Sequence, residues 1–420
     1  MNFRNTLEFA REMDAQDPLA QFRNRFYMPQ KDGKDCIYLC GNSLGLQPKS
    51  VREKIEQELI DWQNLGVEGH FHGKNPWFSY HHFLSKETAN LVGAKESEVV
   101  VMNSLSVNLN LLMLSFYTPT ATRNKILVEA GAFPSDYYAV EQIIKMKGFD
   151  PNECMVECKP KAGQYTLETA DILQQIEALG DSLALVMFGG VNYYTGQYFD
   201  LKSITTAGHQ VGANVGFDLA HATGNLPMQL HDWNIDFATW CSYKYLNSGP
   251  GGTSGVFVHE RYGNNPDLPR LAGWWGHDEK TRFLMKKGFV PQEGAAGWQM
   301  SNAQIFPMAI HKASLEIFEE AGLNNLRQKS VLLTGFLEFL IDAANKEKEL
   351  GFEIITPRNL NERGCQISLL TKANGKELFN QLTEKGVIAD WREPNVIRVA
   401  PVPLYNSFED VFTFVSLLTQ

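Results

Sequence analysis

A lysine in an apolar and aromatic setting is the first residue of this 420-residue chain that could do chemistry. Lys244 follows a strand expected at 237–241, lies between Tyr243 and Tyr245, and precedes a glycine-rich run at 249–252. Desolvation there would lower the pKa of the amine, and a neutral amine is the form that attacks an aldehyde. A lone lysine is usually a solvated surface residue, but this setting favours a lysine that forms a Schiff base.

A carboxylate and an imidazole follow another expected strand. Asp218 ends the strand expected at 214–218, and His221 comes three residues later. A buried carboxylate needs a partner, and a protonated pyridine nitrogen would be a suitable one. An aspartate that caps a turn beside a hydrogen-bonded core histidine explains such a pair equally well when it is seen alone.

A third strand end carries residues suited to an anion. The segment 103–108 follows a strand expected at 98–102, and Ser106 lies where a helix begins. Helix N-terminal amides together with serine hydroxyls bind anions. Serine also caps many helices without binding anything, so this signal is weak by itself.

A fourth strand end carries a flat ring and a second carboxylate. Phe133 and Asp136 follow a strand expected at 125–128, and the Phe133 ring could stack on a planar group. Pro134 between them is equally typical of the first turn of a helix. This signal too is weak when taken alone.

The elements that position these residues are predicted by short apolar runs, each followed by an amphipathic run. Such alternation predicts crossover units and a mostly parallel α/β sheet, whose ligands lie at the carboxyl ends of the strands. All four sites are therefore expected at one edge of the sheet. We expect strands at 98–102, 125–128, 154–156, 183–188, 214–218, 237–241 and 255–259, and helices at 107–116, 135–147, 168–179 and 201–211.

The two ends of the chain differ from this pattern. A long helical stretch from Gln304 to about Ala344, broken near Gly322, is followed by short strands at 352–355, 366–370, 387–389 and 396–399 and a helix at 376–385. We predict a large domain at 49–306 and a small C-terminal α+β domain at 307–420. Residues 1–48 form an N-terminal segment that packs with the small domain.

Composition excludes several classes of protein. Apolar residues make up 44% of the chain and charged residues 20%, which is typical of globular domains. A net charge of −10 argues against a nucleic-acid binder. The most apolar stretch, Leu105–Tyr117, is too short to span a membrane, and no secretory signal is visible. We therefore expect a cytoplasmic protein without a nucleic-acid or membrane partner.

The six cysteines do not indicate a disulfide scaffold or a metal site. Cys36 and Cys40 share a C-x-x-x-C spacing with Cys154 and Cys158, but no further group of ligand-like spacing lies near either pair. Reduced thiols of a cytoplasmic protein are the simpler interpretation, and we expect no metal.

Together, the four strand ends meet the requirements of one cofactor. They supply a phosphate cradle, a ring stacker, a carboxylate for a pyridine nitrogen and an aldehyde-binding lysine, which pyridoxal 5′-phosphate (PLP) requires. Their order along the chain resembles the aspartate-aminotransferase-like superfamily, PLP fold type I, and its class V branch.

More specific motifs resemble the kynureninase family over nearly the whole chain. The motifs around the lysine and near the C-terminus are far more specific than a generic cofactor pattern. The motifs are Gly41-Asn-Ser-Leu-Gly-Leu-Gln-Pro, Phe133-Pro-Ser-Asp, Tyr194-Thr-Gly-Gln, Gly216-Phe-Asp-Leu-Ala-His-Ala, Cys241-Ser-Tyr-Lys-Tyr-Leu-Asn, Gly273-Trp-Trp-Gly-His and Ile397-Arg-Val-Ala-Pro-Val-Pro-Leu-Tyr-Asn-Ser-Phe.

The resemblance implies roles for individual residues. Lys244 binds the cofactor covalently, Asp218 pairs with the pyridinium nitrogen, and Tyr243 takes part in proton transfer, so these three are the implied catalytic residues. One departure from the family is Gly189, where a hydroxyl residue is often found. The implied cofactor-binding residues are Leu105, Ser106, Phe133, Pro134, Ser135, Asp136, Asp218, His221, Tyr243, Lys244, Trp274 and Asn302.

The substrate site follows from the same resemblance. Arg398 would clamp the α-carboxylate of the substrate, and Ser43, His70 and Asn302 would line the rest of the site. His70 and Asn302 match positions that lie beside the aromatic ring in the animal-type branch, so we expect 3-hydroxykynurenine to be accepted well. Trp274 and Asn302 would reach the site from the partner subunit of a homodimer.

The implied activity is hydrolysis of L-kynurenine or 3-hydroxy-L-kynurenine to an anthranilate and L-alanine, in tryptophan degradation and NAD biosynthesis. One alternative is another class V enzyme, such as a cysteine desulfurase or an aminotransferase; Cys365, in an apolar strand-like run, argues against a desulfurase. The other is a catalytically silent PLP-fold binding protein. Such a protein is expected to have lost Lys244 or Arg398, and both are present.

Overall fold

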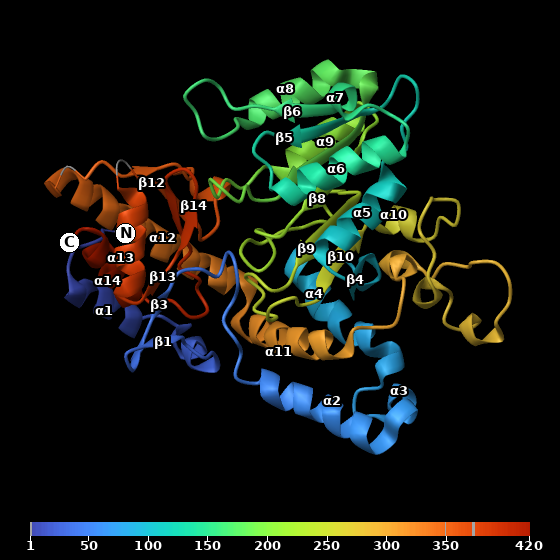
Figure 1. Cartoon of the computed structure of the whole chain (residues 1–420), viewed down its shortest axis with the longest axis horizontal. Helices are drawn as coiled ribbons and strands as arrows, with labels where there is room; N and C mark the ends of the chain where they lie inside the picture. The colour runs from blue at the N-terminus through green and yellow to red at the C-terminus, as the bar shows by residue number, and fades with distance from the viewer. Residues whose placement is uncertain (1, 349, 372–373) are drawn as a thin grey trace.

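A seven-stranded sheet forms the centre of the molecule. The computed structural model describes residues 2–348, 350–371 and 374–420 (Figure 1). The strand order is β4-β10-β9-β8-β7-β5-β6, and β10 alone runs antiparallel to its neighbours. The strands are β4 (Val99–Met102), β5 (Lys125–Glu129), β6 (Met155–Cys158), β7 (Leu183–Gly189), β8 (Asn214–Asp218), β9 (Phe237–Cys241) and β10 (Ser254–Val258).

The predicted mostly parallel α/β sheet is confirmed, and most strand bounds agree within one residue. The sequences of the strands are continuous apolar runs because helices bury both faces of the sheet. The strand predicted at 154–156 begins instead at Met155. Asp150 caps a one-turn helix, α7 (Pro151–Cys154), whose first residue is a proline, and this turn delays the strand.

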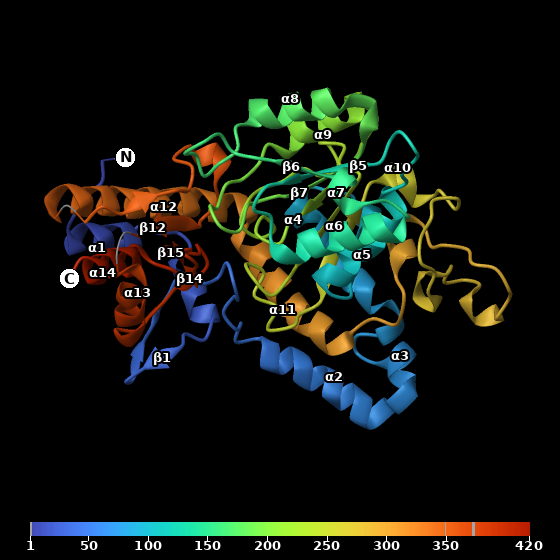
Figure 2. The same cartoon turned by 45° about the horizontal axis from the view of Figure 1, so that its top comes forward.

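Helices cover the sheet in two layers (Figure 2). On one face, side chains of α5 (Leu105–Phe116) and α6 (Pro134–Met146) form one apolar cluster with the strands. On the other face, α4 (Ser85–Val92), α8 (Thr169–Leu179), α9 (Leu201–Gln210) and α11 (Ile305–Ala321) contribute to a second cluster. The helix α2 (Val51–Leu65) packs on the outside of α11.

A second sheet lies in the C-terminal part of the chain, with strand order β11-β12-β15-β14. Its helices surround a third apolar cluster. The predicted helix break near Gly322 is confirmed, since this glycine has φ of 74° between α11 and α12. The elements are α12 (Leu323–Lys348), β11 (Glu353–Ile354), β12 (Ile367–Leu370), α13 (Gly375–Glu384), β13 (Val387–Ile388), β14 (Asp390–Arg392), β15 (Val396–Val399) and α14 (Phe408–Leu418).

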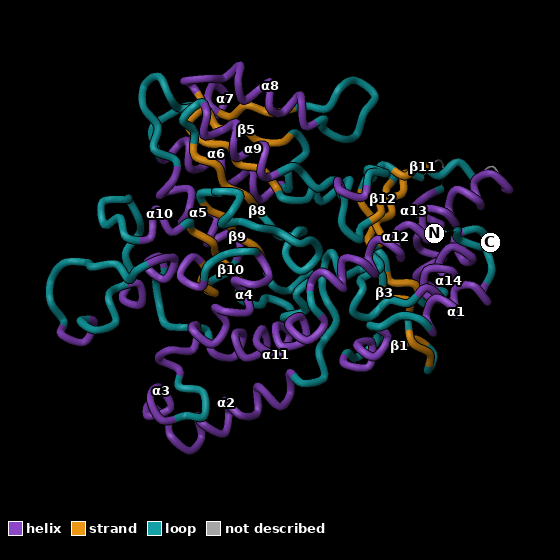
Figure 3. Tube along the Cα trace, turned by 180° about the vertical axis from the view of Figure 1, so that it is seen from behind, coloured by secondary structure: helices purple, strands orange, loops and turns teal. Residues whose placement is uncertain are grey.

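The N-terminal segment lies against this C-terminal part, and Figure 3 shows the two together from behind. The strand β3 (Ile37–Tyr38) pairs in parallel with β13, and α1 (Leu7–Ala15) packs against α14. The predicted domain bounds themselves stay a prediction. The remaining short strands and α-helices are β1 (Gln30–Lys31), β2 (Lys34–Asp35), α3 (Gly69–His72) and α10 (Glu260–Gly263), and several 3-10 turns lie between the elements. No helix among the described residues combines the length and apolar character needed to cross a membrane.

Candidate active site

A cavity of about 360 Å³ lies at the carboxyl ends of the central strands, where side chains of the C-terminal sheet also reach it. It brings together eleven of the predicted residues, although they come from distant parts of the chain. These residues are Ser43, Leu105, Ser106, Phe133, Ser135, Asp136, Asp218, His221, Tyr243, Lys244 and Arg398.

Lys244 lies in the turn after β9 and points toward an imidazole. Its Nζ is 2.9 Å from Nε2 of His221 and 5.9 Å from the centre of the Phe133 ring. Burial lowers the pKa of His221 well below its usual value, with the Lys244 charge as the next cause. His221 is therefore neutral, and its Nε2 can accept a hydrogen bond from Lys244. Its Nδ1 is buried without a hydrogen-bond partner among the described residues.

The N-terminal segment fixes the backbone of the lysine turn. The amide of Gly45 donates to the Tyr243 carbonyl at 2.8 Å. A Cβ atom at Gly45 would lie 2.3 Å from the Lys244 carbonyl oxygen, so only glycine fits without movement of the backbone. The Gly41 motif therefore shapes the turn that carries the reactive lysine.

Three carboxyl groups line the same cavity as the lysine: Asp218 and Glu129 are buried, and Asp136 is half-buried. Asp218 ends β8 and accepts from the Ala220 amide at 2.8 Å, and Asp136 is hydrogen-bonded to it. Burial is the main cause that raises the pKa of both groups, and the Asp218 charge raises that of Asp136 further. Asp136 therefore holds the proton of the pair. Asp218 is then the ionised member of the pair, and a cationic ring nitrogen could form an ion pair with it.

Glu129 is the third carboxyl group and was not predicted from the sequence. It ends β5, is 2% exposed, and accepts hydrogen bonds from the Gly189 amide and the Asn192 side chain at 3.2 and 3.1 Å. Burial raises the pKa of Glu129 to about 8. A Cβ atom at Gly189 would lie 3.3 Å from Glu129 Oε1. Glu129 therefore lies against the position where the family often has a hydroxyl residue.

The start of α5 offers free amides to an anion. Ser104 is the N-cap residue, but its side chain accepts no hydrogen bond from the described helix. Asn108 donates to the Met102 carbonyl and accepts from Asn103, which has φ of 49°, and these bonds hold the turn. The first amides of α5 and the Ser106 hydroxyl are thus placed to cradle a phosphate.

Arg398 reaches the cavity from β15 in the C-terminal sheet. It is 1% exposed; its Nη1 donates to the Tyr193 carbonyl at 2.5 Å and its Nη2 to Asp390 at 2.6 Å. Burial is the main cause that lowers its pKa from the usual value. Arg392, two residues after Asp390 on β14, also lines the cavity. Neither Asp390 nor Arg392 was predicted from the sequence. The Asp-x-Arg spacing in a short strand, which places both side chains on one face, is a signal that could have indicated them.

Tyr243 is the other predicted catalytic residue. It lines the cavity next to Lys244, and burial is the main cause that raises its pKa above the usual value. The phenol therefore keeps its proton at neutral pH. A protonated phenol in the cavity lining is a group that could donate a proton to a bound ligand.

Four predicted residues lie outside the cavity lining. Pro134 begins α6 between two residues that do line it. His70 packs edge-on against Trp77, and its Nδ1 is buried with no partner in the described part of the chain. Trp274 is 44% exposed, and Asn302 is also exposed. The single chain therefore leaves the predicted roles of His70, Trp274 and Asn302 untested.

Two clusters away from the cavity have side chains close enough to share a metal ion, which the sequence had not suggested. They are His81, His82 and Glu279, and Glu98, His231 and His259. Glu98 already accepts hydrogen bonds from the amides of Lys95 and Glu260, so helix capping explains its burial. We assign no metal to either cluster.

Known proteins resemble the chain in both sequence and structure. The family model "Kynureninase C-terminal domain" matches residues 326–418. A kynureninase of Koribacter versatilis is 56% identical over 98% of this chain and 97% of its own length, and one of Flavobacterium psychrophilum is 53% identical over 100% and 99%.

Solved structures share the fold at low sequence identity. The cysteine desulfurase CsdA of Escherichia coli has a TM-score of 0.77 at 18% identity, covering 95% of this chain and 96% of its own. A form of C-DES with glycine covalently linked to its PLP cofactor has a TM-score of 0.75 at 15% identity, covering 91% and 96%. At these identities the likeness shows the fold, which is that of PLP fold type I.

Proposed function

The chain belongs to the kynureninase family, and we propose that it hydrolyses L-kynurenine and 3-hydroxy-L-kynurenine to L-alanine and the corresponding anthranilate. One observation carries the proposal. A single cavity holds a lysine, a buried carboxylate and a buried arginine, which are contributed by Lys244, Asp218 and Arg398 from three separate elements. These groups match an aldehyde cofactor and an amino-acid substrate.

The cofactor is pyridoxal 5′-phosphate, and the cavity fits it. Lys244 would hold its aldehyde carbon, and Asp218 would pair with its ring nitrogen. The free amides at the start of α5 and the Ser106 hydroxyl would hold its phosphate. The buried Nδ1 of His221, which lacks a partner in the described structure, is a further polar atom that a bound group could satisfy. When bound, the cofactor supplies an electron sink for negative charge on the substrate carbons.

The protein's own groups supply the proton transfers. With the cofactor and substrate bound, Lys244 Nζ would be the base that takes the proton from the substrate α-carbon. His221 stays neutral because its pKa is lowered well below the usual value, so at 2.9 Å its Nε2 can orient that amine by accepting a hydrogen bond from it. Water would add to the γ-carbonyl carbon, which then leaves as the carboxylate of the anthranilate, and the Tyr243 hydroxyl, which keeps its proton, would protonate the released β-carbon. Arg398 holds the α-carboxylate, which orients the bond that breaks.

The desulfurase alternative requires a reactive thiolate beside the site. Cys365 is 1% exposed, and burial raises the pKa of its thiol to about 12. Burial also raises the pKa of the Cys40 thiol to about 12. Both thiols are therefore protonated at neutral pH, which counts against nucleophilic roles. The comparisons favour neither this alternative nor a silent binding protein.

The direct test is turnover of L-kynurenine followed by anthranilate fluorescence. We expect steady release of anthranilate by the holoenzyme and none by Lys244→Ala, whose spectrum should also lose the visible band of the bound cofactor. A parallel reaction with L-cysteine should release no sulfide. Sulfide release without anthranilate, or borohydride labelling of a lysine other than Lys244, would contradict the proposal.

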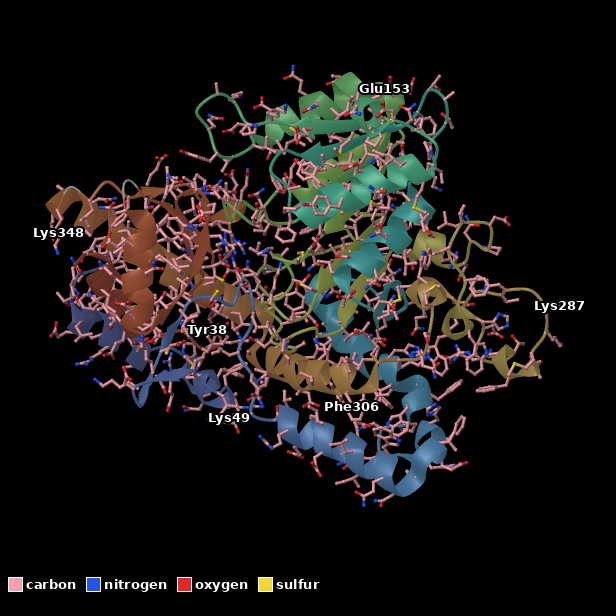
Figure 4. All side chains as sticks on the ribbon, viewed as in Figure 1. Tyr38, Lys49, Glu153, Lys287, Phe306 and Lys348 are labelled. Atoms are coloured by element: carbon pink, nitrogen blue, oxygen red, sulfur yellow. The ribbon has the colours of Figure 1, made fainter. Side chains whose placement is uncertain are left out.

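A homodimer is part of the proposed function. The loop 271–290 projects from the body of the chain, with Lys287 near its tip (Figure 4). It exposes Trp274, Met285 and Val290 at 44%, 72% and 56%. Large exposed apolar side chains in one region are typical of protein interfaces. They support a dimer in which Trp274 and Asn302 reach the partner's cavity.

The cellular setting is the last part of the proposal. All six cysteines, none of them in a disulfide within the described structure, suit a reducing compartment. We therefore place the enzyme in the cytoplasm. There it would contribute to tryptophan degradation and, through 3-hydroxyanthranilate, to NAD biosynthesis.

A further inference from the structure

Arg398 already has hydrogen-bond partners at both terminal nitrogens. The Tyr193 carbonyl accepts from Nη1 at 2.5 Å, and Asp390 Oδ2 accepts from Nη2 at 2.6 Å. Nε is buried and has no partner among the described residues. A substrate carboxylate that binds the guanidinium in a bidentate manner needs two adjacent N–H groups. Nε and Nη2 form such an edge, and Asp390 occupies one of its two positions.

Asp390 also has a second cation as a partner. Arg392 Nε lies 3.0 Å from Asp390 Oδ1, and its Nη2 lies 3.1 Å from Oδ2. Asp390 lies directly opposite Arg398 on the neighbouring strand, so the three side chains meet on one face of the C-terminal sheet. Two guanidinium groups and one carboxylate leave a net charge of +1, which one substrate carboxylate would neutralise.

We infer that Asp390 is a place-holding counter-ion for the substrate α-carboxylate. In the substrate-free enzyme it binds both arginines. When substrate arrives, its carboxylate takes the Nε–Nη2 edge of Arg398, and Asp390 remains bound to Arg392 alone. This inference rests on the proposed function, because it takes Arg398 as the group that binds the α-carboxylate.

The contacts explain why such an exchange is favourable. A buried guanidinium without a partner is costly, so Arg398 needs a counter-ion before substrate binds. Asp390 does not lose all its partners on release, since its bonds to Arg392 persist. The Tyr193 carbonyl holds Nη1 throughout and keeps the guanidinium aimed. The Tyr193 loop is itself fixed by Gln366 and Ser368 on the same sheet, which donate to the Tyr193 and Tyr194 carbonyls.

The experiment is a double-mutant cycle read out by ligand binding to the holoenzyme. The ligand is 4-oxo-4-phenylbutanoate, which has the aryl ketone and carboxylate but no amine, and butyrophenone serves as its match without the carboxylate. Asp390→Asn should lower the Kd of the carboxylate ligand about tenfold, because it removes the competing anion. Arg392→Met should raise this Kd, because Asp390 then has Arg398 as its only partner.

The double variant separates exchange from simple charge repulsion. If Asp390 moves onto Arg392, the loss of Arg392 should have no further effect once Asp390 is an amide. Independent electrostatic effects would instead add. Additive effects, or a Kd for Asp390→Asn equal to or above that of the wild type, would overturn the inference. Butyrophenone should bind all the variants alike.

Two further variants complete the design. Asp342→Asn removes the carboxylate of an exposed pair with Arg358 in the same part of the chain and should leave the Kd unchanged. Asp390→Ser removes the same charge and replaces Asp390→Asn if that variant does not fold. A wild type that binds the carboxylate ligand but does not hydrolyse kynurenine would contradict the proposed function, while the cycle would still test the exchange.

Discussion

At the scale of single residues, the position of a side chain at a strand end was the strongest sequence signal. Lys244, Asp218 and Phe133 were predicted because each follows an apolar strand and has a type suited to one cofactor. Glu129 and Asp390 were missed. The partner of Glu129, Asn192, is 63 residues away along the chain, and the spacing of residues in the sequence does not contain that distance. Asp390 is only eight residues from Arg398, but their contact depends on the register of two neighbouring strands.

Arg398 provides the sharpest residue-scale prediction for catalysis. Arg398→Ala should lower kcat/KM by roughly thirtyfold to several thousandfold, since removing one partner of a buried charge pair costs about 2–5 kcal/mol. Arg398→Lys should also be impaired, because a point charge does not reproduce the planar fork. Steady-state kinetics with L-kynurenine measures both. A near-normal kcat/KM for Arg398→Ala would mean that another group binds the carboxylate.

The raised pKa of Glu129 predicts that the stability of the apoprotein depends on pH. Its pKa is raised from 4.5 to about 8, so the folded apoprotein keeps this proton over a range in which the unfolded chain releases it. The unfolded state then binds fewer protons, and the free energy of unfolding falls as pH rises from 4.5 to 8. Glu129→Gln should remove this part of the slope. Denaturant unfolding of both apoproteins measures it, and parallel slopes would contradict the assignment.

At the scale of elements, apolar runs predicted the strands well, but strand direction and N-terminal pairing were not accessible. The strand at 254–258 lies antiparallel between β4 and β9, and a single buried run carries no sign of its direction. The pairing of β3 with β13 joins segments about 350 residues apart. Packing of residues 1–48 with the small domain was predicted, but the pairing of these two strands follows only from the assembled fold.

A substitution at Gly45 tests whether the N-terminal segment fixes the turn that carries Lys244. Gly45→Ala places a Cβ atom 2.3 Å from the Lys244 carbonyl oxygen, and overpacking of this kind costs about 1–3 kcal/mol. We expect lower stability and weaker cofactor retention, measured by unfolding and by absorbance after dialysis. Gly335→Ala is the control, because it lies in α12 with only the Phe3 ring nearby, at 3.3 Å. Equal behaviour of the two variants would remove the proposed role of Gly45.

At the scale of the whole molecule, the family resemblance implies site roles for three residues that lie outside the cavity of the single chain. Trp274, Asn302 and His70 do not line the cavity of their own subunit. Their predicted roles need either a second subunit or a closure of the chain. Neither distance along the sequence nor burial in a single chain can supply that information.

Subunit mixing tests the proposed dimer. Lys244→Ala and Trp274→Ala should each be inactive alone. Mixed under conditions that exchange subunits, they should regain activity, because one site of each heterodimer then combines Lys244 with an intact partner Trp274. Random exchange makes half of the dimers mixed, so roughly a quarter of the wild-type sites should return. Activity of Trp274→Ala alone, or no recovery after verified exchange, would contradict a shared site.

Hydrolysis of the carbon–carbon bond is tested most directly by the origin of the oxygen atoms in the products. The holoenzyme is incubated with L-kynurenine in water enriched in oxygen-18, and both products are analysed by mass spectrometry. We expect equal amounts of anthranilate and L-alanine, with at least one labelled oxygen in the anthranilate carboxylate and no excess label in alanine over a control of unlabelled alanine in the same water. Transamination without anthranilate, or anthranilate that carries no label, would contradict the account.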